Sequence, residues 1–312
     1  MRQHVTARPG RLIARQRLRA IALTAAAVAS LSAATLASAQ AATVKVTSHF
    51  VFSPIASSVS GDSAFINNGA TNGRPEDLLF ITPNLTPGGI NPCPCLLSPQ
   101  PPVGVYYDAG QWAVFNENGS TMGTLWSYNV LVVPKASKFA FVHKATSSNT
   151  IGNRTLLNSK LLNGKPNALI LVTQNWNPGS ATGIYNANQV GVRYYKSLKR
   201  WGIFNEDGTA MPNNAAFNVL VGQTASNGGK MSVLKATATN RAGSAVLINN
   251  AETNGNPNNV TLVTQDYNPG GKGGTSDVYP ADVSYGAREG VVNWAGPTQK
   301  VGTAYNVLIF SS

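Results

Sequence analysis

The chain has 312 residues, of which 12% are charged and 43% are hydrophobic, and its formal net charge is +12. This hydrophobic content excludes a disordered chain and predicts a folded protein with a polar, largely uncharged surface. Six of the 24 basic residues lie in residues 1–39, so the remainder carries 18 basic against 12 acidic residues, a net charge of +6. That excess argues against a nucleic-acid-binding protein and is compatible with contact to anionic envelope polymers.

Residues 1–39 have the composition of a secretory signal peptide. Six arginines precede an alanine-rich apolar run from Ala20 to Leu36, and Ala37-Ser38-Ala39 follows as a cleavage site. Basic, hydrophobic and small-residue segments in this order are typical of a signal peptide. A transmembrane anchor is the competing interpretation, but the run is marginal in length and weakly hydrophobic. We therefore expect a secreted, periplasmic or cell-surface protein, with no membrane span in the mature chain.

The rest of the chain is repetitive. Asn72-Gly73-Arg74-Pro75 recurs 91 residues later as Asn163-Gly164-Lys165-Pro166, and again after the same interval as Asn254-Gly255-Asn256-Pro257. A second segment, which ends in Pro-Gly, recurs in phase at residues 82–88, 173–179 and 264–270. Three copies in one register indicate duplication. A unit of this length is too long for a propeller blade or a solenoid coil, and long enough to close a small core.

The repeat predicts three domains in series after the signal peptide, at residues 43–134, 135–224 and 229–312, of which the third is diverged. In the second we expect strands at Phe139–Ala145, Thr155–Asn158, Ala168–Thr173, Gln189–Tyr195, Trp201–Asn205 and Ala216–Val221. These segments are mostly short, rich in β-branched or aromatic residues, and bounded by Asn, Gly or Pro. The predicted fold is all-β, with three tandem small antiparallel β-sandwich or barrel modules.

One pair of strands recurs with particular clarity. Trp201–Asn205 leads into a Glu-Asp-Gly turn, and Phe217-Asn218-Val219 runs back from it. The pattern returns at Trp112 with Tyr128-Asn129-Val130, and in worn form at Trp294 with Tyr305-Asn306-Val307. We expect the aromatic residues to form the cores. Each Asn should bind loop backbone groups, because an unpaired buried amide costs about 1–3 kcal/mol; a ligand-binding role is the lesser alternative.

The sequence offers little for catalysis or metal binding. His4 belongs to the signal peptide, which leaves His49 and His143, too few for a histidine-based triad or metal site. Glu206 and Asp207 are adjacent, and adjacent strand residues point to opposite faces, so they make a poor acid–base pair. They also lack the alternating acidic spacing of calcium loops. We therefore predict no enzyme, no catalytic residue, no metal and no cofactor.

Cys93 and Cys95 stand in an insertion that occurs in the first repeat. Export favours oxidation of cysteine. A disulfide between residues so close in sequence closes a tight, strained ring. A local disulfide, an intermolecular link and a soft-metal pair all remain open, although two thiols do not complete a zinc site.

Two loop aromatics are the candidate ligand-binding residues. Trp176 lies in Gln-Asn-Trp-Asn-Pro-Gly, and Tyr267 lies in Gln-Asp-Tyr-Asn-Pro-Gly. An aromatic face beside polar side chains suits a neutral sugar, which stacks on the ring and hydrogen-bonds to the polar groups. The competing interpretation is that each ring folds back as a plug for the end of the sandwich, and Leu85 at the same place in the first repeat favours it.

The motif Trp201–Gly208, followed by Met211 and Phe217-Asn218-Val219 and preceded by Val172–Gly179, resembles a secreted bacterial domain family of unknown function that occurs in tandem. The resemblance is weaker in the first repeat and weakest in the third. It implies export and repetition, and it implies no activity.

Two functions remain open at this point. The first is an exported, non-enzymatic binding or adhesion protein, whose repeats give avidity toward glycan or another envelope polymer. The second is a self-associating structural surface or matrix protein, whose copies pair through edge strands.

Overall fold

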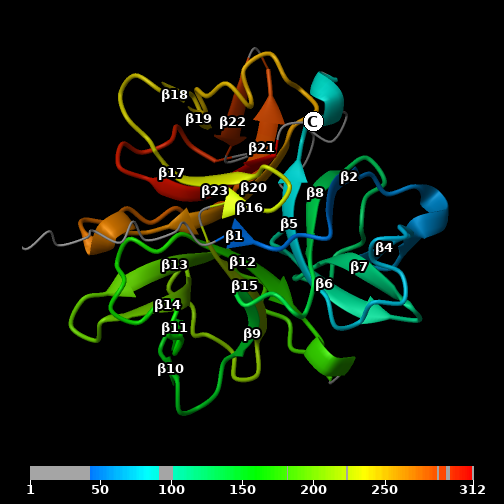
Figure 1. The fold of residues 1–312 in the computed structure, drawn as a ribbon, viewed down its shortest axis with the longest axis horizontal. Coiled ribbons are helices and arrows are strands. Elements are labelled where there is room, and N and C mark those ends of the chain that lie inside the picture. Colours follow the sequence, from blue (N-terminus) through cyan, green and yellow to red (C-terminus); the bar gives the residue numbers. More distant parts are fainter. Residues whose placement is uncertain are drawn as a thin grey trace, which may run out of the picture. The chain divides into compact units, whose positions relative to one another are not determined.

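Short β-strands make up nearly all the regular structure of the chain (Figure 1). The computed structural model describes residues 43–90, 101–180, 182–222, 224–286, 288–292 and 296–310. The predicted signal peptide, Cys93, Cys95 and Trp294 lie outside these residues. The described helical elements are 3₁₀ turns at Ala56–Ser58 (η1), Pro87–Gly89 (η2), Pro178–Ser180 (η4) and Pro269–Gly271 (η5). The predicted all-β class is confirmed.

Repeat 1 contains β1 (Thr43–Val44), β2 (Ser48–Phe52), β3 (Val59–Ser60), β4 (Ser63–Ile66), β5 (Leu78–Asn84), β6 (Val103–Asp108), β7 (Gln111–Asn116) and β8 (Ser127–Val133). Repeat 2 contains β9 (Ala140–Lys144), β10 (Thr150–Ile151), β11 (Arg154–Leu156), β12 (Ile170–Asn175), β13 (Val190–Tyr195), β14 (Arg200–Asn205) and β15 (Ala216–Val221), and β16 (Thr224–Ala225) follows it. Repeat 3 contains β17 (Lys230–Lys235), β18 (Arg241–Ala242), β19 (Ala245–Leu247), β20 (Val260–Asp266), β21 (Asp282–Tyr285), β22 (Glu289–Val292) and β23 (Ala304–Phe310). The strands predicted in repeat 2 agree with β9 and β11–β15 to within about two residues.

Each sheet in the described part of the chain combines strands of different repeats: two sheets join two repeats, and the third, with nine strands, joins repeats 2 and 3 and also includes β1 of repeat 1. The strand orders are β3-β4-β7-β6-β12-β15-β9, β1-β16-β17-β23-β20-β13-β14-β11-β10 and β18-β19-β22-β21-β5-β8-β2. Pairing inside a repeat is antiparallel, whereas the junctions β6–β12, β13–β20 and β21–β5 are parallel. Because the third junction returns from repeat 3 to repeat 1, the repeats are linked in a ring. Figure 1 draws β5, β12 and β20 where the repeats meet.

Each repeat closes a core of its own between its two groups of strands, as predicted. Fully or almost fully buried side chains fill these cores, among them Trp112, Tyr128 and Val130 in repeat 1, Trp201, Phe217 and Val219 in repeat 2, and Val283, Tyr305 and Val307 in repeat 3. The recurrent aromatic residues Trp112 and Trp201 are therefore core residues. The sandwich architecture expected for each repeat is confirmed.

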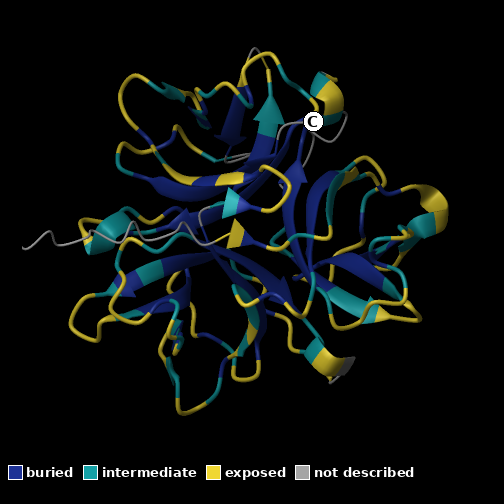
Figure 2. Cartoon of the chain, viewed as in Figure 1, coloured by how far each residue is buried: buried dark blue, intermediate teal, exposed yellow. Residues whose placement is uncertain are grey.

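A further core is shared by all the repeats. It includes Leu78, Phe80, Leu131, Leu171, Leu220, Leu262, Leu308 and Phe310. In β5, Leu78 and Phe80 face this shared core while Leu79 and Ile81 face the core of repeat 1, because successive strand residues point to opposite faces. The central strands are thus buried on both sides (Figure 2). The repeats are sandwiches, but they are not separate beads, and Ala41–Ser312 forms one compact unit.

The Asn inside each Phe-Asn-Val or Tyr-Asn-Val strand joins its repeat to the preceding one in the ring. Its Nδ2 donates to a carbonyl oxygen of a central strand: Asn129 to Thr261 at 2.9 Å, Asn218 to Leu79 at 2.9 Å, and Asn306 to Ile170 at 3.1 Å. The prediction that these amides bind loop groups is therefore wrong. They bind strand backbone in another repeat, because the central strands approach one another closely.

Threonines at the same level of the central strands make the reciprocal connection. Their Oγ1 atoms accept from backbone N–H groups: Thr173 from Ile81 at 3.1 Å, Thr264 from Val172 at 2.8 Å, and Thr82 from Val263 at 2.9 Å. Each threonine thus binds the preceding repeat in the ring, as the asparagine does, but as an acceptor instead of a donor. The first residue of the Thr-Pro-Asn, Thr-Gln-Asn and Thr-Gln-Asp motifs thus provides a hydrogen-bond acceptor for a buried backbone N–H group where the three central strands meet without pairing in one sheet.

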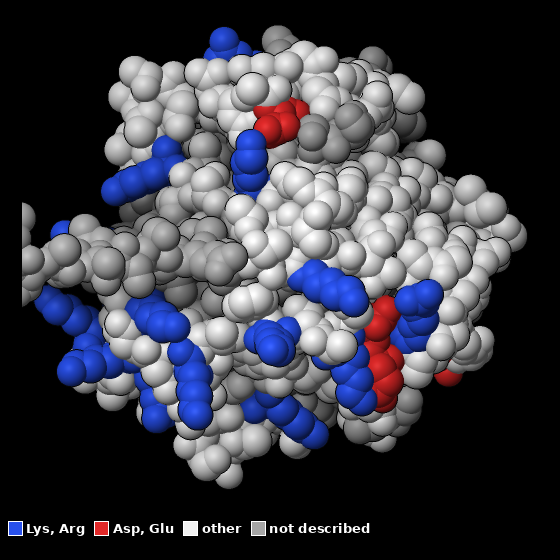
Figure 3. Space-filling view, viewed as in Figure 1, with Lys and Arg blue, Asp and Glu red and all other residues white. Residues whose placement is uncertain are grey.

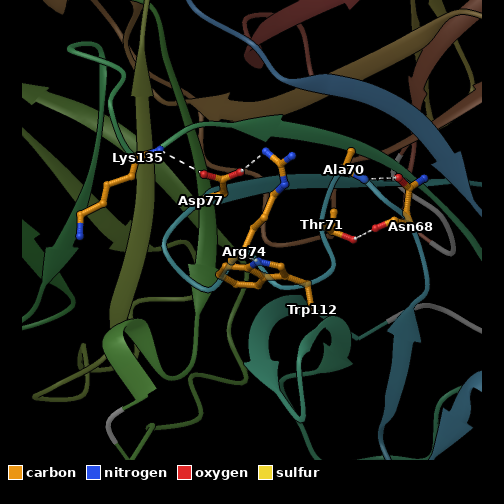
Figure 4. Close-up of polar contacts among 7 residues, drawn as sticks. All are labelled: Asn68, Ala70, Thr71, Arg74, Asp77, Trp112 and Lys135. Carbon is orange, nitrogen blue, oxygen red and sulfur yellow. Dashed lines mark hydrogen bonds and ion pairs between the residues drawn. The ribbon is translucent and has the colours of Figure 1, made fainter.

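The tryptophans also hold the Asn-Gly-x-Pro loops. Trp112 Nε1 donates to the carbonyl oxygen of Arg74 at 2.9 Å (Figure 4), and Trp201 Nε1 donates to that of Lys165 at 2.8 Å. Asp77 is 3.9 Å from the Arg74 guanidinium in the same loop. The tryptophan motif and the Asn-Gly-x-Pro motif, which both recur in the sequence, are therefore in direct contact in repeats 1 and 2.

In repeat 3, Glu289 takes the place of this tryptophan. The backbone N–H of Leu157 donates to Trp201 O at 2.9 Å, and that of Ile248 donates to Glu289 O at 2.9 Å in the equivalent position. The prediction that Trp294 is the third copy of Trp112 and Trp201 is therefore wrong. The pairing of β22 with β19 places Glu289 at the equivalent position, although the nearest tryptophan in the sequence is Trp294. Burial raises the pKa of the Glu289 carboxyl to about 7.

Candidate functional site

The Asn-Pro-Gly loops at the β6–β12 and β13–β20 junctions are each anchored by the side-chain amide of their own Asn. After β12, the Trp176 N–H donates to Val105 O at 2.9 Å. Asn177 then accepts from the N–H of Tyr107 at 3.0 Å and donates to its carbonyl oxygen at 2.9 Å, as a further strand residue would. Asn268 makes the same pair of bonds with β13. The amide that follows each loop aromatic thus has a structural role: it fixes the loop to the neighbouring repeat. As a result, the aromatic residue before it lies at the junction.

Trp176 borders a cleft between repeats 1 and 2. This Trp176 cleft has a volume of about 350 Å³ and is lined by Asp62, Ser63, Tyr106, Asp108, Phe115, Trp176, Asn177 and Tyr185. Trp176 is half-buried, because the backbone of Gly183 packs so closely on its ring that a Cβ there would overlap it. The ring is therefore neither fully exposed nor a plug in the sandwich core.

Aromatic rings follow one another around the Trp176 cleft. Tyr106 lies 6.0 Å from Trp176 and 5.6 Å from Phe115, measured between ring centroids. Tyr185 lies 5.6 Å from Phe115 and 6.1 Å from Trp176. Most of these contacts are edge-to-face, the arrangement that aromatic quadrupoles favour. The rings hold one another in place, so the cleft is preformed.

The Trp176 cleft is acidic. Asp62 accepts from the Tyr185 hydroxyl at 2.8 Å and from Ser63 Oγ at 2.7 Å, and Asp108 is exposed at its edge. Burial, followed by the bond to Asp62, raises the pKa of Tyr185 to about 12. No Lys, Arg or His is among the described residues that line the cleft. Elsewhere, Lys and Arg side chains spread over the face drawn in Figure 3, mainly in its lower part, where Figure 1 places repeat 2.

Tyr267 occupies the equivalent place between repeats 2 and 3, with different neighbours. Its ring lies 5.9 Å from Phe204, and the guanidinium carbon of Arg193 lies 4.4 Å from its centroid. Arg154 and Arg193 also flank the Tyr195 ring, at 4.6 and 5.2 Å. The two aromatics predicted from the sequence are thus not in one site. Trp176 borders an acidic cleft, and Tyr267 is covered by an arginine of its own chain.

The model of one family, described as a domain of unknown function (DUF7452), matches residues 27–132, 104–221 and 191–309. The chain belongs to the DUF7452 family. Comparison with curated proteins and with solved structures gave no match. The tandem repetition expected from the sequence is thereby confirmed.

Consecutive DUF7452 matches overlap at residues 104–132 and 191–221. These stretches hold β6–β8 and β13–β15, and β6 and β13 are the strands that pair across a junction. A DUF7452 unit as matched therefore includes strands from both sides of a junction. The repeat boundaries at 134 and 224 stay predictions.

Buried carboxyl groups secure two junctions between DUF7452 repeats. Glu117 accepts from the backbone N–H of Asn186 at 2.9 Å, and burial raises its pKa to about 8. Glu206 is held in the same way by the backbone of Asp277, and burial raises its pKa to about 9. Neighbouring Asp207 is exposed and caps the turn at Thr209. The adjacent carboxyl groups of Glu206 and Asp207 therefore have separate structural roles.

We expect Glu206→Gln to flatten the pH dependence of stability between about pH 5 and 9. Over that interval Glu206 is ionised in the unfolded chain but keeps its proton in the folded protein, because burial raises its pKa to about 9, so stability falls as pH rises. The amide stays neutral, which removes about 1–3 kcal/mol of that fall. Urea unfolding at pH 5, 7 and 9 measures it, with exposed Glu76→Gln as the control. An unchanged slope would mean that Glu206 is ionised in the folded protein.

Most residues of the Trp176 cleft were not predicted. Sequence comparison of the repeats singled out Trp176 but not Tyr106, Tyr185 or Asp62. A signal was present: Tyr106 and Arg193 follow Val105 and Val192 at the same register of β6 and β13, so a surface position varies on an otherwise similar strand. The repeats therefore differ at a surface position that lies beside the junction.

The described ranges contain neither a metal-ligand cluster nor a helix that could span a membrane. No cluster of three or more His, Cys, Asp or Glu in that part of the chain could hold a metal ion. None of its helices is long and apolar enough to span a bilayer. Cys93 and Cys95, the predicted disulfide candidates, fall in residues 91–100, outside the described structure.

Proposed function

We propose that this chain is an exported, non-enzymatic binding protein that holds a saccharide of a glycan or another cell-envelope polymer in the Trp176 cleft. One observation carries the proposal: a preformed cleft in which aromatic rings stand beside carboxylates. A sugar offers apolar C–H faces to aromatic rings and hydroxyl groups to hydrogen-bond acceptors. The volume of about 350 Å³ falls in the range of small-ligand sites, about 300–1,000 Å³.

Further features support this proposal. The signal-peptide pattern in residues 1–39 points to export, which would bring the protein to envelope polymers. The buried carboxyl groups Glu117 and Glu206 bind backbone at the junctions, so they are not paired across a substrate-sized gap. Asp62 and Asp108 are the acidic residues among those that line the cleft, and their oxygens can accept hydrogen bonds from a ligand.

We expect Trp176→Ala to weaken saccharide binding by about tenfold or more, about 1.4 kcal/mol, because a large aromatic wall of the cleft is removed. Calorimetric titration against a panel of neutral and charged oligosaccharides measures the change. Tyr267→Ala is the matched control, since its ring is covered by Arg193, and we expect its affinity to equal that of the parent chain. Binding to none of the panel, or equal affinity of the Trp176 variant, would contradict the proposal.

The alternative, a self-associating surface or matrix protein, draws less support. The strands that meet at the junctions pair within the chain, so those edges are not free for another copy. The outer strands of the described sheets are β1, β3, β10 and β18, with two residues each, and β2 and β9, with five. Short edges make poor templates for pairing. Assembly that rises with concentration and ignores added sugar, seen by size-exclusion chromatography, would favour the alternative.

A further inference from the structure

The junction between repeats 2 and 3 shows which chemistry the loop aromatic accepts. Val105 and Val192 take the same place in their parallel junctions, so the residues that follow them, Tyr106 and Arg193, are equivalent. Arg193 lies over the Tyr267 ring, with its guanidinium carbon 4.4 Å from the centroid. A cation over an aromatic face is attracted by the ring quadrupole. The fold thus seats a cation against the loop aromatic of this junction.

The Trp176 cleft keeps the aromatic position and lacks the cation. Trp176 is the counterpart of Tyr267, since each follows its central strand and donates its N–H to β6 or β13 at 2.9 Å. Tyr106 stands in the place of Arg193 and borders the cleft from the side. The space that a guanidinium fills in one junction is therefore part of an open cleft in the other.

The Trp176 cleft also has carboxylates that the second junction lacks. Asp62 corresponds to Asn153, because the backbone carbonyl oxygen of each accepts a hydrogen bond from the backbone N–H of the Asn that ends the neighbouring strand, at 3.0 Å for Asn116 and 2.9 Å for Asn205. Asp108 corresponds to Tyr195, by the registers of the β6–β7 and β13–β14 hairpins. Burial raises the pKa of the Tyr106 hydroxyl, and both Asp62 and Asp108 raise it further, so both carboxylates act on the cleft. Negative charge and aromatic faces together favour a cation.

We propose that the Trp176 cleft binds a cationic amino sugar, whose ammonium group is neutralised by Asp62 and Asp108 and packs on the aromatic rings. This inference rests on the saccharide-binding function proposed above and names its ligand class. The ligand supplies from outside the positive charge that Arg193 supplies within the chain at the second junction. Basic residues outnumber acidic ones in the chain as a whole. A preference for cationic ligands is therefore expected at this acidic cleft and not over the rest of the surface.

The test is a calorimetric titration of the full chain with a matched pair of ligands, a glucosamine tetramer and an N-acetylglucosamine tetramer. They differ in the charge of the amino group, and the pH is held slightly acidic so that free amines are protonated. We expect the amino tetramer to bind about tenfold more tightly. Added salt should reduce the difference, because the carboxylates at the cleft edge are screened.

Variants separate charge from shape. The double variant Asp62→Asn with Asp108→Asn should bring the two affinities together, and Asp108→Asn by itself, at an exposed position, should reduce the difference without affecting folding. Glu76→Gln with Asp207→Asn, which removes the same charge outside the cleft, should leave the difference unchanged. Tyr106→Arg should weaken binding of both tetramers, because it places a guanidinium where Arg193 stands in the second junction. Unfolding midpoints establish that each variant is folded.

The outcomes are distinguishable. Equal affinity for the two tetramers, or tighter binding of the acetylated one, overturns the amino-sugar inference and leaves the saccharide function standing. Binding of neither tetramer, together with no binding across the oligosaccharide panel, overturns the function itself. Binding of propylammonium as tight as that of the amino tetramer would show an ammonium site without sugar recognition, and would also overturn the inference.

Discussion

Asn218→Ala is expected to lower the free energy of unfolding by about 2–5 kcal/mol, since each buried polar group left without a partner costs about 1–3 kcal/mol. Asn218 is fully buried, and its Nδ2 donates to Leu79 O at 2.9 Å. Its Oδ1 accepts from Asn175 Nδ2 at 2.8 Å. The substitution removes both bonds and leaves buried groups of repeats 1 and 2 unsatisfied.

Urea unfolding followed by far-ultraviolet circular dichroism measures this loss. Asn213→Ala is the matched control, because Asn213 is exposed in the turn before β15, and exposed substitutions usually change stability by less than about 0.5 kcal/mol. A loss for Asn218→Ala no larger than that of the control would show that the bonds between repeats contribute little to stability.

The second large effect concerns the isolated repeat. We expect a fragment of residues 135–224 to show no cooperative unfolding transition, whereas residues 43–312 unfold in one. Alone, the fragment exposes the edge of β12 that pairs with β6 and the edge of β13 that pairs with β20. Leu171 and Leu220 also lose the shared core. A unit of this size is close to the lower limit of independent stability even before these losses.

Two probes test this expectation. Tryptophan fluorescence reports on the surroundings of the tryptophans, among them Trp112 in the core of repeat 1 and Trp201 in the core of repeat 2. Circular dichroism reports on all the strands, so coincident transitions in the 43–312 chain indicate one cooperative unit. The isolated fragment is compared at the same protein and urea concentrations. If it unfolds with the midpoint of the longer chain, the junctions are not needed for folding, and the repeats behave as independent domains.

Local patterns in the sequence predicted the elements well. The strands of repeat 2 and the core positions of Trp112 and Trp201 were recognised because alternation, turn residues and recurrent aromatics act over short stretches of chain. The assignment of Trp294 failed because repeat 3 differs in length beyond its Pro-Gly loop, and counting from a tryptophan misses a change of register. In the structure, the register of β22 identifies Glu289 instead.

The candidate site was largely beyond such reasoning. Asp62, Tyr106, Trp176 and Tyr185 come from separate segments of two repeats, and the sequence separation between them carries no sign of their approach. Trp176 was found because it recurs in a loop, but its acidic surroundings depend on the β6–β12 junction. The surroundings of Tyr267 differ from those of Trp176 because Arg193 covers the Tyr267 ring. This contact depends on the pairing of β13 with β20, which the sequence did not predict.

Inspection of the sequence was enough to recognise a threefold repeat of short strands with aromatic cores, because hydrophobic alternation and turn chemistry act on neighbouring residues. The way in which the repeats join became evident in the folded chain. The repeats join through parallel strand pairing and through Asn and Thr bonds between central strands, and both depend on groups far apart in the chain. The backbone groups at a strand edge are the same for every sequence, so the sequence gives no sign of which edges will pair. The same junctions bring rings and carboxylates together in one cleft and an arginine onto a ring in another.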